Sequence, residues 1–417
     1  MTAEIAILNM HGVALAADSA ITLNTGDNLP KIYHSANKIF TLSKYHPVGI
    51  MIFNNANFMG IEWEIIIKEY RRKLGDNCLG SLFDYANDFI KYVENFEYVP
   101  VEIQTEYLLS LCLDVLSRVK SSFIENLKNK YNENIKDIPD DNITDVFNNT
   151  IEEIKIIQKK KKNEECFVLD INFIKSNYNE IDKVIQIVFE NFIVSDDQKN
   201  ELINILINDI QKGVCIRQRY SGIVITGYGN KEIFPSIYVC NICGKIGTSL
   251  VRFDEIKDAI TVSHTASIRP FAQTEMVSSF MEGIDPEFEN TIIKQIKTLI
   301  DAISSEMDES YQEKLNKIKD GFLDYIARFK NDVYVSPIMD IVDSLQKSDL
   351  AEMAEALVNL TSFKRHISKE FETVGGPTDV AIISKGDGFI WIKRKHYFDI
   401  DLNKHFLENY YRGENDE

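Results

Sequence analysis

The chain has 417 residues, of which 44% are hydrophobic and 11% aromatic, so it can build at least one large core and is not a disordered chain. Sixty-four acidic against 46 basic residues give a formal net charge of −18, which disfavours nucleic-acid binding. No run of about 18 apolar residues predicts a membrane-spanning helix, and no leader pattern opens the sequence. We therefore expect a cytoplasmic protein without a nucleic-acid or membrane partner.

The first 75 residues alternate between apolar runs and turn residues, which is typical of strands. His11-Gly12 separates the first two runs and predicts a tight turn between them. Apolar residues at helical spacing begin near Gly60, and Gly75 predicts the end of that helix. The strands expected here are residues 3–8, 13–17, 38–42 and 48–53.

Residues 76–213 have a helical pattern rich in Asn, Lys, Glu and Ile. Two interruptions, at Pro139 and at the lysine run 159–162, are predicted to be loops. Four consecutive lysines are more typical of a solvated surface than of a phosphate site. The strand and helix order of the rest of the chain does not account for this block, so we interpret it as a helical insertion.

After residue 213 the sequence again shows the short apolar runs that are typical of strands. Two apolar runs, residues 222–228 and 236–240, precede a second helical stretch over residues 274–370. A Gly-Asp-Gly turn at 386–388 between apolar runs predicts a closing β-hairpin over residues 379–392. Opening and closing hairpins with helices between them favour two packed sheets covered by helices. The predicted divisions are residues 1–75 and 214–417 for the sheets, with an extended helical block at about 285–370, and residues 76–213 for the insertion.

The six cysteines suit a reducing compartment, because most are scattered among apolar or mixed residues. Cys240 and Cys243 form one Cys-x-x-Cys, without a second pair or a histidine at zinc-ligand spacing. We interpret this pair as a strand end and turn in preference to a metal or redox site. We expect neither a metal nor a cofactor.

Thr2 is the first residue of the sequence with a candidate catalytic role. Initiator Met is usually removed before a small side chain, so the mature chain is expected to begin at Thr2. Its hydroxyl and free α-amine then sit on one residue, and an α-amine with a pKa near 7.7 can accept a proton at neutral pH. A hydroxyl beside such a base is an activated nucleophile. Many proteins begin with Met-Thr, so this observation needs support from the surrounding residues.

An aspartate and a lysine further along the chain are candidates to support a nucleophile at Thr2. Asp18 comes directly after the second apolar run, and Lys38 opens a later strand. A lysine near Thr2 would ease removal of the hydroxyl proton, and an aspartate paired with it would keep that lysine charged and fixed. The alternative is a turn aspartate and an ordinary lysine at the start of a strand.

The stretch from Thr2 to Thr22 resembles the start of proteasome β-subunits and their bacterial relatives, which are N-terminal-nucleophile hydrolases. That family begins with Thr, turns a hairpin at Gly and continues with Ala-Ala-Asp-Ser/Thr. Residues 16–19 read Ala-Ala-Asp-Ser here, at the family's own spacing from Thr2. The family then opens a strand with Lys, and Asn37-Lys38-Ile39 is similar. Lys31 is the competing residue, but the flanking pattern favours Lys38.

The resemblance implies an α+β fold, the four-layer αββα sandwich of N-terminal-nucleophile hydrolases, here with a long helical insertion. It implies Thr2, Asp18 and Lys38 as catalytic residues. A main-chain N–H at Asn54 or Asn55 would receive the oxyanion, where the family has Gly. The residues at the positions of the family's specificity pocket are apolar and predict cleavage after an apolar side chain; they are Ile21, Ile52 and Ala56.

The resemblance weakens further along the chain. A supporting Ser of the family falls on Ala272, and another falls on Val374. The acid of the same terminal loop is displaced to Glu372, whereas Gly375 and Gly376 match. These departures favour altered or lost activity, while Thr2, Asp18 and Lys38 favour an active enzyme.

The leading hypothesis is therefore a threonine-type amidohydrolase that acts as a proteasome-like peptidase on a peptide or protein substrate after Met1 removal. The main alternative is a catalytically silent scaffold whose helical insertion binds a protein partner. A third hypothesis is an amidase acting on a small molecule. The family's habit of forming rings adds homo-oligomerisation to these expectations.

Overall fold

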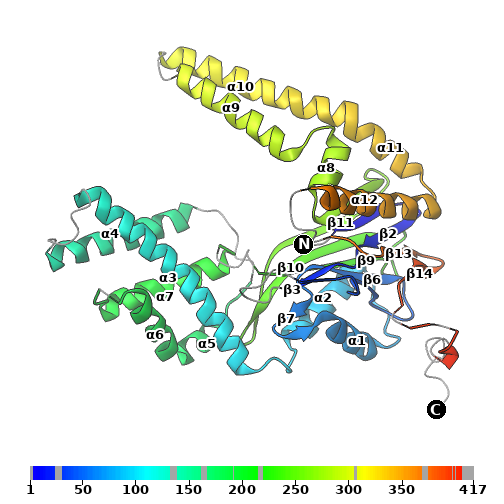
Figure 1. The fold of residues 1–417 in the computed structure, drawn as a ribbon, viewed down its shortest axis with the longest axis horizontal. Helices are drawn as coiled ribbons and strands as arrows, with labels where there is room; N and C mark the ends of the chain where they lie inside the picture. Colours follow the sequence, from blue (N-terminus) through cyan, green and yellow to red (C-terminus); the bar gives the residue numbers. More distant parts are fainter. Residues whose placement is uncertain are drawn as a thin grey trace.

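The computed structural model is a mixed α/β structure with antiparallel sheets (Figure 1). Two five-stranded sheets occupy the centre of the molecule, and two helical arms extend from them toward the same side (Figure 1). No described helix is long and apolar enough to cross a membrane. The structure describes residues 3–23, 31–131, 139–160, 167–190, 192–214, 219–304, 308–368, 374–396, 398–399 and 401–405.

The first sheet is built around the opening hairpin. Strands β1 and β2 pair antiparallel through the turn at Met10-His11, as the sequence predicted. The last hairpin of the chain joins this sheet, because β13 pairs with β2. The strand order is β12-β1-β2-β13-β14, with β1 Ala3–Asn9, β2 Gly12–Ala17, β12 Ala266–Ala272, β13 Asp379–Ser384 and β14 Gly388–Lys393.

The second sheet gathers strands from either side of the helical block that the sequence placed at residues 76–213. β6 pairs antiparallel with β9, so Phe53 lies opposite Gly222 across that block. The strand order is β11-β10-β9-β6-β5, with β5 Ile39–Thr41, β6 Val48–Asn54, β9 Ser221–Gly227, β10 Ser236–Ile246 and β11 Ser249–Ala259. Two short ribbons complete the strands: β3 Ile21–Leu23 with β4 Lys31–Tyr33, and β7 Asn57–Phe58 with β8 Ile61–Glu62.

Both faces of the central strands are covered, which explains why these strands read as continuous apolar runs. On β1, Ala6 and Leu8 face a core shared with Met51 and Val224 of the second sheet. The alternate residues of β1, among them Ile7, face a different core formed with helices. Successive side chains of a strand point to opposite faces, so a strand between two cores needs apolar residues at every position.

Helices cover the outer face of each sheet (Figure 1). Trp63 and Phe89 pack with residues of the second sheet, and Leu350 and Leu357 pack with residues of the first. The covering helices are α1 Trp63–Leu74 and α2 Leu82–Glu94 on the second sheet, and α8 Glu275–Glu282, α11 Ser336–Ser344 and α12 Lys347–Ile367 on the first.

The next helices form one arm with a core of its own. Phe123 and Phe147 lie at the centre of that core. The arm joins the second sheet at the β10–β11 turn, where Ile246 and Val251 belong to the same core. Its helices are α3 Val101–Tyr131, α4 Asp140–Lys160, α5 Ile171–Ser176, α6 Tyr178–Val188 and α7 Asp196–Gln211. The division at residues 76 and 213 stays a prediction; α2 packs with α1 on the second sheet rather than in this arm.

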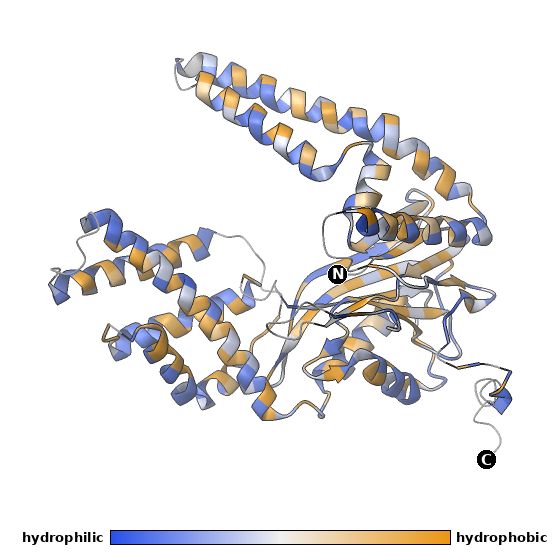
Figure 2. Cartoon of the chain, viewed as in Figure 1, coloured by the Kyte–Doolittle hydropathy of each residue, from blue (hydrophilic) through white to orange (hydrophobic). Residues whose placement is uncertain are grey.

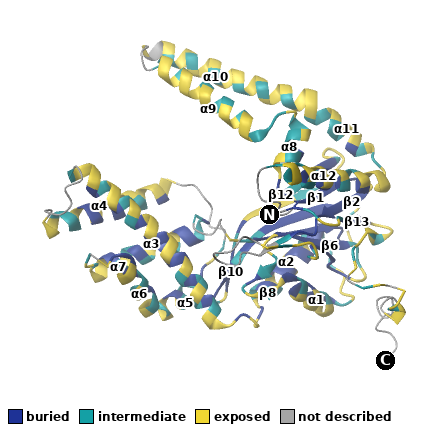
Figure 3. Ribbon diagram, viewed as in Figure 1, coloured by how far each residue is buried: buried dark blue, intermediate teal, exposed yellow. Residues whose placement is uncertain are grey.

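The other arm is a helical hairpin whose described residues are exposed or half-buried (Figure 3), and its first helix contains no buried residue. It consists of α9 Pro286–Ser304 and α10 Glu309–Lys330, and a short π-helical segment, Asn331–Val335, leads from it into α11.

The structure differs from the sequence prediction at the lysine run and in the strands of the later part of the chain. Lys159 and Lys160 are the last residues of α4 and not a loop; the remaining two lysines of the run lie outside the described residues. The strands β11 and β12 were not predicted. The second half of β11 is exposed and reads Asp-Glu-Ile-Lys-Asp, which lacks the apolar content by which a strand is recognised.

Candidate functional site

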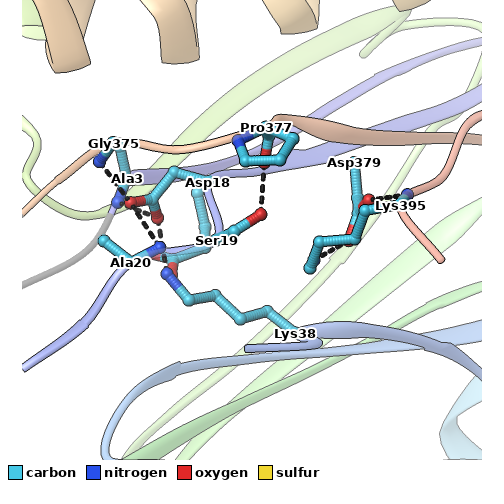
Figure 4. Close-up of polar contacts among 10 residues, drawn as sticks. Ala3, Asp18, Ser19, Ala20, Lys38, Gly375, Pro377, Asp379 and Lys395 are labelled. Carbon is cyan, nitrogen blue, oxygen red and sulfur yellow. Dashed lines mark hydrogen bonds and ion pairs between the residues drawn. The ribbon is translucent and has the colours of Figure 1, made fainter. Parts of the chain in front are cut away.

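A buried ion pair lies where the first hairpin ends. Asp18 follows β2 directly, and Lys38 precedes β5 on the neighbouring sheet. The Lys38 ammonium donates to Asp18 Oδ1 over 2.5 Å, and the two residues are only 6% and 1% exposed (Figure 4). The structure therefore brings together the two charged residues that the sequence singled out, although they come from different sheets.

Main-chain groups hold the Asp18 carboxylate in place. Oδ1 accepts from the Ala3 N–H at 3.0 Å, and Oδ2 accepts from the N–H groups of Gly375 at 2.9 Å and Ala20 at 3.3 Å (Figure 4). Together with Lys38, four donors surround one carboxylate, and this satisfies the acceptor capacity of an ionised Asp. The carboxylate is thereby fixed between the start of β1 and the loop before β13.

The Gly375-Gly376 loop is part of this cluster. Ser19 donates from its main-chain N–H to the Gly375 carbonyl over 3.2 Å and from its hydroxyl to the Pro377 carbonyl. Gly376 has a φ of 80°, and a Cβ at that position would come within 2.8 Å of the His34 side chain. Only glycine adopts this conformation in so little space, which gives a physical reason for the two glycines of the predicted terminal loop.

Glu4 is a member of the cluster that the sequence analysis missed. Its Oε1 lies 3.2 Å from the Lys38 ammonium, and the residue is 3% exposed. Lys38 thus lies between two carboxylates. The signal was present in the sequence, because a single acid in the apolar run Ala3–Leu8 has to be paired if the strand is buried.

The predicted pocket residues meet beside Lys38. The lining of one small pocket includes Lys38, Asn54 and Asn55 together with the three predicted apolar residues Ile21, Ile52 and Ala56. The same three apolar residues also border a larger cavity of about 380 Å³. Most of its other lining residues are polar or acidic: Tyr33, Ser35, Asn37, Glu62 and Glu64. The three apolar residues therefore line both the pocket beside Lys38 and a cavity with acidic residues.

Asn54 occupies a backbone conformation that accounts for its residue type. Its φ is 68°, in the left-handed region, where Gly is free of strain and Asn is among the residues best tolerated. The Asn54 side chain also donates to the Tyr220 carbonyl over 2.9 Å. No acceptor for the main-chain N–H of Asn55 is found among the described residues, and its side chain accepts from the Asn57 N–H. Asn54 thus has a backbone conformation that glycine also adopts without strain.

Ala272 lies opposite Ala3 in the sheet and has a φ of 60°. An Ala in the left-handed region costs roughly 1–2 kcal/mol. The next residue, Gln273, is buried and accepts from the Arg365 side chain, which ties this strand end to α12. The strained residue is therefore held by its surroundings, at the end of the strand that pairs with the start of β1.

Two of the residues proposed from the sequence, Thr2 and Glu372, lie outside the described residues. Lys31, the competitor of Lys38, is exposed on β4, and the ion pair with Asp18 is made by Lys38.

No group of three or more His, Cys, Asp and Glu side chains in the described ranges could hold a metal ion. Cys240 and Cys243 both lie inside β10, so the predicted strand end and turn at this pair is wrong, and the two sulfurs are not bonded to each other. Burial raises the pKa of the Cys240 thiol to about 11, so this sulfur is not a thiolate at neutral pH.

No protein-family model matches the sequence, and no curated protein does either. Among solved structures, the chain is similar to Anbu (ancestral beta-subunit) from Yersinia bercovieri, with 7% sequence identity and a TM-score of 0.26. The superposition covers 98% of this chain and 93% of that one. A likeness this loose establishes neither a common fold nor a common activity.

Proposed function

We propose that this protein is an N-terminal threonine hydrolase that cleaves amide bonds in peptides, built on an αββα sandwich of the N-terminal-nucleophile type. One observation carries the proposal. The buried Lys38–Asp18 pair is hydrogen-bonded to the N–H of Ala3, the residue directly after Thr2. Because consecutive Cα atoms are about 3.8 Å apart, a nucleophile on Thr2 is within reach of this pair.

The net charge of the buried cluster favours an additional positive group beside it, such as the α-ammonium of Thr2. Glu4 and Asp18 contribute two negative charges and Lys38 contributes one positive charge, all of them nearly excluded from solvent. Buried charges are costly unless they are balanced. Removal of Met1 would release an α-ammonium on Thr2 and supply a second positive charge.

The proposed reaction proceeds through an acyl-enzyme. The Thr2 hydroxyl oxygen attacks the amide carbonyl carbon, and the α-amine, through a water molecule, accepts the hydroxyl proton and passes it to the leaving amine. Water then hydrolyses the ester, and the amine again transfers the proton. Lys38 favours the deprotonated hydroxyl, and Asp18 orients Lys38 through a charge-assisted hydrogen bond.

The oxyanion needs a donor that points into the pocket beside Lys38. The main-chain N–H of Asn54 or Asn55 is proposed for this role, and the absence of a described acceptor favours Asn55. Removing one such donor typically costs about 10²–10³ in rate. Ile21, Ile52 and Ala56 line the same pocket, so an apolar side chain is preferred before the scissile bond.

The second candidate function is the silent scaffold. The absence of supporting hydroxyls at Ala272 and Val374 favours it, and in that case the α3–α7 arm would bind a protein partner. A small-molecule amidase is the third. A panel of peptides compared with small amides separates the first candidate from the third.

The test combines intact-protein mass with four variants. Mass spectrometry determines whether Met1 is removed. Thr2→Ala should abolish amide hydrolysis, Thr2→Ser should retain part of it, and Lys38→Ala should be as damaging as Thr2→Ala. Lys31→Ala is the matched control, because Lys31 lies exposed on the next strand, and it should have little effect.

Labelling with an electrophile directed at an N-terminal threonine provides the second readout. We expect a single adduct on Thr2, lost in Thr2→Ala and weakened in Lys38→Ala. Full activity in Thr2→Ala, or an adduct on another residue, would contradict the mechanism and favour the scaffold.

A further inference from the structure

The helical hairpin of α9 and α10 has an apolar face that no described residue covers. α9 contains no buried residue, and Lys330 at the base of the hairpin bridges Glu282 of α8 and Glu289 of α9 at 2.6 and 2.7 Å. Figure 2 shows apolar residues along both helices of this arm, and Figure 3 shows that the arm is partly exposed and partly half-buried. Such a face on a projecting arm requires an explanation, because exposed apolar patches of this kind mark interaction sites.

On α10 the apolar residues of this face, most of them exposed, follow a strict pattern. They are separated by four, three, four, three and four positions, which is the spacing of a coiled-coil seam. Ile318 and Tyr325, in the middle of the seam, are 67% and 62% exposed. The half-buried residues Leu323 and Ile326 lie on another side of the helix, toward α9. The seam consists of five exposed residues and the half-buried Leu315; the five are Tyr311, Ile318, Phe322, Tyr325 and Phe329.

α9 carries a matching stripe. Phe288 and Leu299 are 60% and 62% exposed, and each directly precedes a half-buried residue of the interhelical side. On α10, Phe322 precedes the half-buried Leu323 in the same way. Each step of one residue along a helix corresponds to a rotation of 100° about the helix axis. On both helices the exposed stripe is therefore rotated by about this angle, and in the same direction, from the side that faces the other helix. Because the two helices run antiparallel, this equal rotation places both stripes on one face of the hairpin.

We infer that this face binds the same face of a second copy of the chain, so that two hairpins form an intermolecular four-helix bundle about a twofold axis. A coiled-coil seam is complementary to another helix with the same seam, and a twofold interface uses one surface twice. The polar residues of α10 carry both signs of charge, among them Lys314, Asp320 and Arg328. A helix that lies on a lipid surface would instead favour a polar side rich in Lys and Arg.

The area available agrees with a dimer. Each of the five aromatic side chains on this face is about half exposed, so each can still bury on the order of 100 Å². With the exposed Ile and Leu residues the face reaches on the order of 700–800 Å² per copy, which is the size of a standard specific interface. The inference does not depend on the proposed hydrolase activity.

The experiment is sedimentation velocity of the full chain from about 1 to 100 µM. Ile318→Glu places a charge in the middle of the seam, and Ile187→Glu is the matched control, because Ile187 on α6 is 69% exposed and lies outside the hairpin. We expect a wild-type dimer, an unchanged dimer in Ile187→Glu, and a dissociation constant at least about 100-fold higher in Ile318→Glu. Far-ultraviolet circular dichroism should be the same for all three proteins. Tyr325→Lys serves as a second seam variant if Ile318→Glu loses helix.

A monomeric wild type over the whole range would overturn the inference, and so would equal dissociation in the two glutamate variants. Binding of the wild type to neutral or anionic vesicles, lost in Ile318→Glu while the dimer persists, would assign the face to a membrane surface instead. Cross-linked peptides mapped by mass spectrometry should join the hairpins of two copies, and cross-links confined to the sheets would contradict the bundle.

Discussion

At the scale of single residues, the candidate site depends on a lysine held between two acids. Asp18 is fixed by main-chain donors at both of its oxygens, whereas Glu4 approaches Lys38 from β1. In the sequence, Glu4 lies two residues from the proposed nucleophile, Thr2. Glu4 is therefore expected to act on the protonation of the site, and not only on packing.

Glu4→Gln tests this expectation. A carboxylate stabilises a nearby ammonium and raises its pKa, so removing the charge of Glu4 should let the catalytic amine lose its proton at lower pH. The acid limb of the pH profile of kcat/KM should move down by about half a unit to one unit. Glu64→Gln is the control, because Glu64 borders the neighbouring cavity and is paired with Lys68. An unchanged acid limb in Glu4→Gln would leave Glu4 a purely structural role.

The sequence identified Asp18 and Lys38 because a family resemblance supplied their roles, and the structure then showed their contact. Glu4 was missed because one acid in an apolar run is ordinary for a strand with an exposed face. Only the structure shows that every residue of β1 is buried. The opening and closing hairpins were predictable from local patterns. Their union in one sheet was not, because β2 and β13 pair across more than three hundred residues and no local signal encodes such a contact.

At the scale of elements, the central strands are insulated from solvent. β10 passes between two cores over most of its length, and Cys240 on this strand is fully buried. A thiol in such surroundings is a structural apolar residue, and its raised pKa makes it unreactive.

Alkylation of the native protein measures this insulation. With a thiol pKa of about 11, roughly 0.1% of Cys240 is thiolate at pH 8, so iodoacetamide should leave it unmodified for hours. Cys78 is exposed and should react much faster than Cys240, which provides an internal control in the same peptide map. Rapid modification of Cys240, or a disulfide between Cys240 and Cys243, would contradict this prediction and favour a redox role for the Cys-x-x-Cys pair.

At the scale of the whole molecule, the two sheets are joined where the chain passes from β11 to β12. Asp258 of β11 accepts from Arg269 of β12 over 2.7 Å, and the side chains of Ser267 and His264 lie at 3.2 and 3.3 Å. Burial alone would raise the pKa of the Asp258 carboxyl, but the hydrogen bond and charge of Arg269 outweigh it and hold that pKa below its usual value.

Asp258→Asn should destabilise the protein at neutral pH and change its response to acid. A depressed pKa contributes stability above the unfolded value of about 3.9 that is lost as the pH falls through the folded value. We expect a loss of about 1–3 kcal/mol at pH 7, measured by urea unfolding, and a smaller difference from wild type below pH 4.

Asp387→Asn removes an exposed pair with Lys347 and should have little effect at either pH. A pH-independent loss in Asp258→Asn would attribute the destabilisation to packing.

The pairing of the first sheet also sets the order in which the chain can acquire its structure during synthesis. β1 pairs with the strand that contains Ala272, and β2 pairs with the strand that begins at Asp379. Both partner strands are synthesised later, so the first hairpin leaves the ribosome with both of its edges unpaired. The α3–α7 arm has mainly local contacts and is completed much earlier. Until the last hairpin emerges, two long apolar edges are open to pairing with other chains. A nascent chain of this protein is therefore a natural client for chaperones, and a stop codon before β13 should produce an aggregating fragment and not a smaller folded protein.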